Sequence, residues 1–98
     1  MSLTSFQKRY LRGLAHALSP VVMLGQKGVT ASVRSELQQA IEHHELLKVR
    51  LSGGDREARA SQLAELTADS DIEVVQIVGH TATLWQRNEK APRLPLPK

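Results

Sequence analysis

The apolar residues of this chain alternate between two spacings, and this alternation constrains its fold more than any other feature of the sequence. Helical spacing of three to four residues occupies positions 4–18, 31–44 and about 56–68. Short apolar or alternating runs, typical of strands, occupy positions 21–24, 46–51, 72–78 and 81–85. The chain is therefore predicted to run α-β-α-β-α-β-β.

The ends of the predicted helices carry residues that are typical of helix caps. Thr4 and Gln7 have capping-box spacing, and Pro20 ends the first helix because proline disfavours helical geometry in the residue before it. Thr30 and Asp55 precede the second and third helices, where their side-chain oxygens can accept hydrogen bonds from backbone N–H groups. These boundaries support three separate helices.

Each predicted helix has apolar side chains at helical spacing. In the first helix they recur every four residues as Phe6, Tyr10, Leu14 and Leu18, flanked by Leu3 and Leu11. The inward faces expected for the other two helices consist of Val33, Leu37, Ala40, Ile41, Ala60, Leu63, Ala64 and Leu66. Helices with one apolar face are expected to pack on a sheet.

The predicted strands differ in how much of each we expect to be buried. The continuous apolar run at 21–24 predicts a buried strand, whereas the alternation at 46–51 predicts a half-buried one. Lys48 and Arg50 lie on the exposed face of that second strand. Trp85, at the end of the last strand, is expected in the core rather than as a surface on which bases stack.

These elements predict one compact α+β domain with an α/β-like chain order, spanning residues 1–87. A chain of 98 residues has the size of a single domain. The second and third helices suit right-handed crossovers between parallel strands, and the closing hairpin adds an antiparallel strand. We expect a four-stranded mixed sheet packed with three helices, and a flexible, basic, proline-containing tail at 88–98.

Composition excludes several classes of function. The absence of cysteine excludes a disulfide framework, a thiolate zinc site and a cysteine nucleophile. The four histidines lack metal-ligand spacing and nothing resembles a nucleophile elbow, so we expect no metal, no cofactor and no enzyme. No apolar run could span a membrane and no signal peptide is visible, which predicts a cytoplasmic protein.

The loop at 25–28, Gly-Gln-Lys-Gly, joins a predicted strand to a predicted helix and is the strongest candidate for a binding site. Its two glycines let a nucleic-acid backbone come close because no Cβ intrudes. Lys27 adds a charge, and the following helix offers unpaired N–H groups at its N-terminus. KH domains clamp nucleotides with a loop of this kind. The alternative is an ordinary tight turn that uses glycine for its backbone conformation.

Basic side chains are concentrated outside the middle of the chain. Residues 1–50 carry seven basic and three acidic side chains, residues 51–85 two and six, and residues 86–98 four and one. Lys8, Arg9, Arg12 and His16 fall within an arc of about 100° on the first helix, opposite its apolar stripe. An arc without acidic residues favours contact with an anion, and a solvated face is the alternative. Only three aromatic residues are present, which argues against binding RNA by stacking many bases.

Three segments, in this order, resemble the signatures of the CRM (CRS1–YhbY) RNA-binding domain. They are LRGLAHALSPVVMLGQKGVT at 11–30, EHHELLKVR at 42–50 and VGHT at 78–81, the last followed by Leu84. The resemblance extends to about residue 87 and is strongest to stand-alone bacterial members of the family. It implies the element order predicted above and a fold similar to the C-terminal domain of bacterial translation initiation factor 3.

The resemblance also implies a function. It implies RNA binding, with ribosomal RNA in precursors of the large (50S) ribosomal subunit as partner, and a role in ribosome assembly. The residues expected to bind RNA are Lys8, Arg9, Arg12, His16, Gly25, Gln26, Lys27, Gly28, Arg34, Lys48 and Arg50. We expect a monomer that does not contact membranes. The alternative is a protein-interaction module that joins a ribosome or RNA-processing complex through its sheet or first helix, without gripping RNA.

Overall fold

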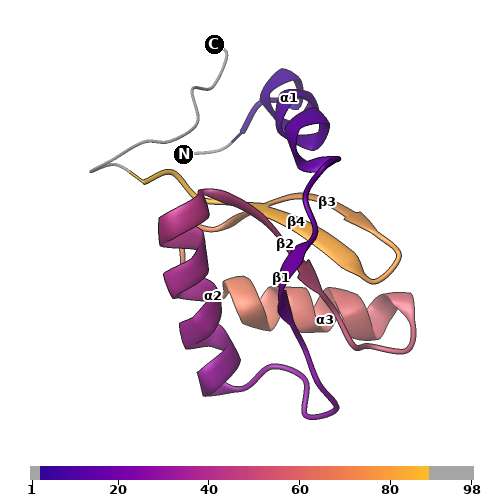
Figure 1. Ribbon diagram of the computed structural model, residues 1–98. Helices are drawn as coiled ribbons and strands as arrows, with labels where there is room; N and C mark the ends of the chain where they lie inside the picture. Colours follow the sequence, from indigo (N-terminus) through magenta and orange to yellow (C-terminus); the bar gives the residue numbers. More distant parts are fainter. Residues whose placement is uncertain (1–2, 89–98) are drawn as a thin grey trace.

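The computed structural model of the chain describes residues 3–88 and contains three helices and four strands (Figure 1). In chain order they are α1 (Ser5–Ala15), β1 (Pro20–Met23), α2 (Ala31–His44), β2 (Leu46–Arg50), α3 (Arg56–Thr67), β3 (Glu73–Val78) and β4 (Thr81–Trp85). The predicted element order and the α+β class are confirmed. Apart from Asn88, the tail that we expect at 88–98 lies outside the described residues.

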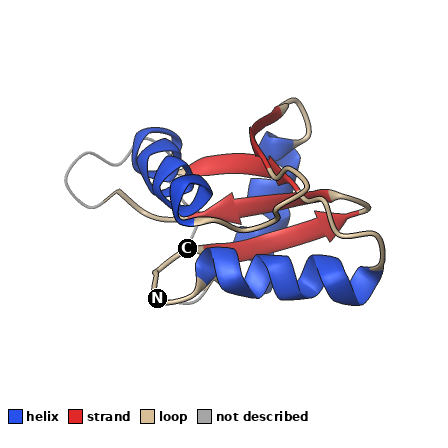
Figure 2. Ribbon diagram, turned by 90° about the horizontal axis from the view of Figure 1, so that it is seen from below, coloured by secondary structure: helices blue, strands red, loops and turns tan. Residues whose placement is uncertain are grey.

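The four strands form one mixed sheet in the order β1-β2-β4-β3. β1 and β2 pair in parallel, and β4 runs antiparallel to both β2 and β3. β4 is therefore inserted between the two strands that α3 connects, which places β3 at an edge. α1 lies on one face of the sheet and α2 and α3 lie on the other (Figure 1); Figure 2 views the sheet from the side of α2 and α3.

Each face of the sheet has its own hydrophobic core. The larger core joins the sheet to α2 and α3, and Leu37, Ile41, Leu63 and Leu66 contribute from these helices. The smaller core, between the sheet and α1, consists of Leu3, Leu11, Ala15, Leu46, Val75 and Trp85. Trp85 is 2% exposed, which confirms its predicted place in the core.

Side-chain hydrogen bonds confirm the predicted helix starts. Thr4 Oγ1 accepts from Gln7 N, and Gln7 Oε1 accepts from Thr4 N, both at 3.0 Å. Thr30 and Asp55 each accept from the backbone N–H three residues later. α2 has the predicted bounds, whereas α1 ends at Ala15 rather than at residue 18.

The apolar stripe of α1 is largely exposed, and residues beside it make the buried contacts. Phe6 is 56% exposed, Tyr10 37% and Leu14 39%, whereas Leu11 and Ala15 are fully buried. At about 100° per residue, the buried pair lies between the stripe and the basic arc. Recurrence every four residues therefore misidentifies which side of this helix faces the sheet.

Two further burial predictions are wrong. β1 is an edge strand and not a buried one: Val22 is buried, but Val21 and Met23 are exposed because no helix covers that side of the strand. In α3, Ala60 and Ala64 are exposed, since the helix contacts the sheet through a narrow stripe of leucines. Both errors come from assuming that every small or apolar side chain in a periodic pattern is buried.

Candidate nucleic-acid interface

The loop at 25–28 is a tight turn, as its spacing predicted. Gly28 N donates to Gly25 O at 3.0 Å, which closes a four-residue turn with Gln26 and Lys27 at its tip. Both tip side chains are exposed. Val29 and the cap residue Thr30 join this turn to α2.

The two glycines of this turn have different roles. Gly28 has φ +70°, a conformation that side chains rarely adopt, and a Cβ there would lie 3.4 Å from Gln62 Nε2. A Cβ on Gly25 would meet nothing within 4 Å, and its φ is not in the left-handed region. Gly28 therefore serves the turn itself, whereas Gly25 leaves open space above the backbone.

The N-terminus of α2 adds a partial positive charge to this loop. The first turn of the helix carries no acidic side chain, so nothing within it offsets the positive end of the helix dipole. Thr30 Oγ1 satisfies the N–H of Val33 at 3.1 Å. The loop and the helix together form a local environment that favours a phosphate over a cation.

Strand register divides the α1 side of the sheet into rows of side chains. Leu46 of β2 and Glu73 of β3 both pair with Trp85 of β4, and Leu46 and Trp85 belong to the core under α1. Partners in register point to the same face. The next two rows, which lie beyond that core, are Lys48–Thr83–Gln76 and Arg50–Thr81–Val78. We call these two rows the open half of the sheet.

A groove of about 290 Å³ opens over these two rows. It is lined by His16, Pro20, Lys48, Gln76, Val78, Thr81 and Thr83. None of these seven residues is acidic. His16 is the C-cap of α1, so the groove begins where the basic arc of that helix ends.

Of the cationic residues predicted on α1 and β2, His16 and Lys48 line this groove. Arg9, Arg12 and His16 are exposed, and Lys8 is half-buried. Arg50 is exposed in the row next to Lys48, and its carbonyl accepts from Leu24 N at 2.9 Å. Leu24 immediately precedes the loop at 25–28. The backbone thus leads from the end of α1, along the edge strand β1, to the glycine turn.

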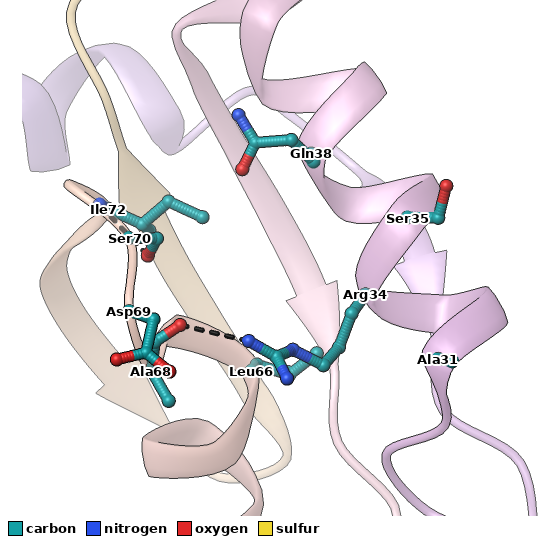
Figure 3. A pocket seen from close by; sticks show the side chains of 9 residues that line it. All are labelled: Ala31, Arg34, Ser35, Gln38, Leu66, Ala68, Asp69, Ser70 and Ile72. Atoms are coloured by element: carbon teal, nitrogen blue, oxygen red, sulfur yellow. Dashed lines mark hydrogen bonds between the residues drawn. The ribbon is translucent and has the colours of Figure 1, made fainter.

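Arg34 lies apart from this surface. Its Nη2 donates to Ala68 O at 3.0 Å, across a second groove of about 300 Å³ between α2 and the end of α3 (Figure 3). This groove is also lined by Ala31, Ser35, Gln38, Leu66, Asp69, Ser70 and Ile72. The contact joins α2 to Ala68, the C-cap of α3, and Arg34 itself is exposed.

The sequence analysis missed the uncharged residues of the open half of the sheet. Gln76, Thr81 and Thr83 line the groove with Lys48, yet none of them carries a charge. Alternation in β4 does place the two threonines on one face, but the pattern alone does not show that β4 lies beside β2. Within residues 3–88, no group of three or more histidine or acidic side chains could hold a metal ion. No helix in this part of the chain is long and apolar enough to cross a membrane.

Several bacterial proteins are similar to this chain along nearly its whole length. An RNA-binding protein of Haemophilus influenzae is 40% identical over 97 residues, covering 99% of this chain and 97% of the relative. A probable RNA-binding protein of Pseudomonas aeruginosa is 38% identical, with 92% and 86% covered. The probable RNA-binding protein YqeI of Bacillus subtilis is 32% identical, with 97% and 99% covered.

The fold and a family model agree with these sequence similarities. The solution structure of a hypothetical protein from Staphylococcus aureus superimposes with a TM-score of 0.83 at 27% identity, covering 98% of this chain and all of the other. The model of the CRS1 / YhbY (CRM) domain matches residues 3–86. The chain therefore belongs to the CRS1/YhbY (CRM) domain family.

Proposed function

We propose that this protein binds RNA along a strip that runs from the basic arc of α1, over the open half of the sheet, to the loop at 25–28. The observation that carries the proposal is the open backbone at Gly25, in the same turn as the exposed Lys27 and shortly before a helix whose first turn has no acidic residue. These three features together favour a phosphate group. The names of the relatives, which are RNA-binding proteins, support the same class of ligand.

The strip suits recognition of backbone and shape more than stacking of bases. Arg12, Lys48, Arg50 and Lys27 supply charge along it, and Trp85 is buried in the core. Contacts to phosphates fix the position of an RNA but carry no direct sequence information. Binding should therefore weaken steeply with salt. On single-stranded RNA, the slope of log K against the logarithm of salt concentration should be more negative by about 0.7 for each phosphate contacted.

The finer proposal is that the RNA is ribosomal RNA in precursors of the large ribosomal subunit. It rests on the resemblance of residues 11–30 and 42–50 to stand-alone bacterial members of the family. The test is sedimentation of cell extracts, followed by crosslinking and sequencing of the bound RNA. Co-sedimentation with particles smaller than the mature large subunit, and crosslinks in its RNA, are expected. Crosslinks spread evenly over unrelated RNA would overturn the assignment.

RNA binding itself is tested with a charge reversal in the loop and a matched reversal elsewhere. Lys27→Glu should lower the affinity for single-stranded RNA about tenfold or more, because it replaces a phosphate contact with repulsion. Arg56→Glu makes the same change of charge on α3, where Arg56 is exposed beside Ile77 and Gly79, and should change affinity less than threefold. Equal effects of the two variants would show that only net charge matters and would contradict the proposed strip.

One observation favours a second function, that of a protein-interaction module. Phe6, Tyr10 and Leu14 form an exposed apolar stripe on α1, on a side that the basic arc does not occupy. Exposed apolar patches of this kind are common where proteins associate. A partner that remains bound after nuclease treatment, and is lost on Phe6→Ser with Tyr10→Ser, would establish this function beside or in place of RNA binding.

A further inference from the structure

We infer that the groove between the end of α1 and the β3–β4 hairpin holds one unstacked nucleotide of a single-stranded RNA and reads its base. The inference rests on the proposed RNA binding and names the part of the RNA that this groove recognises. It starts from the register of the sheet, which sets Lys48, Thr83 and Gln76 side by side across three strands.

The groove has the chemistry needed to recognise the edge of a base. The Gln76 amide has both donors and an acceptor, and a threonine hydroxyl donates and accepts as well. Thr83 is 1% exposed and lines the groove, so it lies at the floor of the groove. A donor and acceptor set held on three rigid strands can distinguish bases by their hydrogen-bonding edges.

The charge of the groove suits the phosphate of the same nucleotide. Lys48 lines it, His16 stands at the α1 end, and none of the described residues that line it is acidic. Arg50 is exposed in the adjacent row. A phosphate beside Lys48 would continue the line of phosphates toward Lys27, because β1 leads from this region into the glycine turn.

The size and the walls of the groove select a single nucleotide. At about 290 Å³ it lies just below the range of about 300–1,000 Å³ for ligand pockets, a size that suits one nucleotide. None of the residues that the structure describes in its lining is Phe, Tyr or Trp. Pro20 and Val78 provide apolar surface for the face of one base. The groove therefore accepts a base that is already unstacked from its neighbours, as in a loop or a bulge.

The test measures the affinity of the protein for four RNA dodecamers, each a homopolymer of one of the four nucleotides. The wild type should prefer one of them, and Gln76→Ala and Thr83→Val should each weaken binding of that dodecamer about threefold to tenfold, the effect of one lost hydrogen bond. Binding of the other three should change less, so the preference should shrink. Gln38→Ala removes an amide from the groove between α2 and α3, and should leave all four affinities unchanged.

The control for the backbone strip is Lys27→Glu, which should weaken all four dodecamers by the same factor and keep their order. If Gln76→Ala and Thr83→Val keep the wild-type affinities while Lys27→Glu does not, the groove holds no nucleotide, although the proposed RNA binding stands. If the wild type binds none of the four, the proposed function and this inference both fail.

Because Thr83 is buried, a second measurement does not depend on replacing it. In the wild type, the Thr83 methyl and Gln76 side-chain amide resonances should shift on addition of the preferred dodecamer. Resonances that stay in place while those of the loop at 25–28 move would overturn the inference.

Discussion

Two strand-to-helix junctions of this protein contain a pair of glycines, and they use them in opposite ways. The junction after β1 holds Gly25 and Gly28, and the junction after β2 holds Gly53 and Gly54. Each leads to a helix capped by a polar side chain. At Gly25 a Cβ would meet nothing within 4 Å, whereas at Gly53 it would lie 2.7 Å from the backbone nitrogen of Arg59.

The surroundings of the second junction explain why it is closed. Gln62 Oε1 accepts from Ser52 N at 3.1 Å and from Gly53 N at 2.9 Å, and Arg59 Nη1 donates to Gly53 O at 3.2 Å. Asp55 caps the helix and Glu57 adds a second acid to its first turn. The backbone groups are thus occupied, and the acids offset the positive end of the helix.

One side chain connects the two junctions. Gln62 holds the junction after β2 through its oxygen, and its Nε2 would lie 3.4 Å from a Cβ on Gly28. The two turns are therefore neighbours at the same end of the sheet. The comparison shows that a glycine pair between a strand and a helix is compatible with an open, cationic turn or with a closed, acidic one, and that local packing decides which forms.

Of the two glycine junctions, the one after β2 should show the larger loss of stability, in Gly53→Ala. The added Cβ would lie within 3 Å of backbone atoms of Ala58 and Arg59, which cannot move without shifting α3. We expect unfolding free energy to fall by roughly 2–3 kcal/mol and the melting temperature by roughly 10 °C or more. Gly54→Ala is the matched control, since its Cβ meets nothing within 4 Å. Equal stabilities of the two variants, measured by urea denaturation, would break the comparison.

A smaller loss of stability is expected for Gly28→Ala. Its φ of +70° costs an alanine roughly 1–2 kcal/mol. The turn would loosen but the two cores would remain, so circular dichroism should show native secondary structure with a lower melting temperature. An unchanged melting temperature would mean that the turn at 25–28 has another conformation in solution.

Another prediction compares a buried and an exposed apolar side chain of α1. Leu11 is fully buried, so Leu11→Ala should lower the unfolding free energy by about 2–5 kcal/mol, whereas Leu14→Ala should lower it by less than about 1 kcal/mol. The unfolding free energies of the two variants should be measured by urea denaturation under the same conditions. Similar losses would place the exposed stripe in the core and contradict the orientation of the helix on which the open half of the sheet depends.

Much of the fold was predictable from local patterns. The caps at Thr4, Thr30 and Asp55 predicted where the helices begin, because a cap is a contact between residues three positions apart. The alternation of Leu47, Val49 and Leu51 predicted the inward face of β2, because successive side chains of a strand point to opposite faces. The orientation of α1 was not predictable, since its apolar side chains outnumber the positions that a single covering helix can bury.

The candidate site was predictable in part. The loop at 25–28 and the cations Lys48 and Arg50 could be chosen from the sequence, since a glycine pair and basic side chains are visible there. Thr83 and Gln76 could not, because they become neighbours of Lys48 only when β4 is inserted between β2 and β3. Nor does the sequence show that Arg34 contacts Ala68, since that contact depends on how α2 and α3 pack.

The central claim is that the open backbone at Gly25 admits a phosphate of the RNA, and one variant tests it most directly. Gly25→Ala adds a Cβ to open space, so the melting temperature should stay within about 2 °C of the wild type. Its affinity for single-stranded RNA, measured by fluorescence anisotropy at fixed salt, should fall about threefold to tenfold because the methyl group occupies the place of the phosphate. Wild-type affinity in a stably folded Gly25→Ala protein would contradict the account.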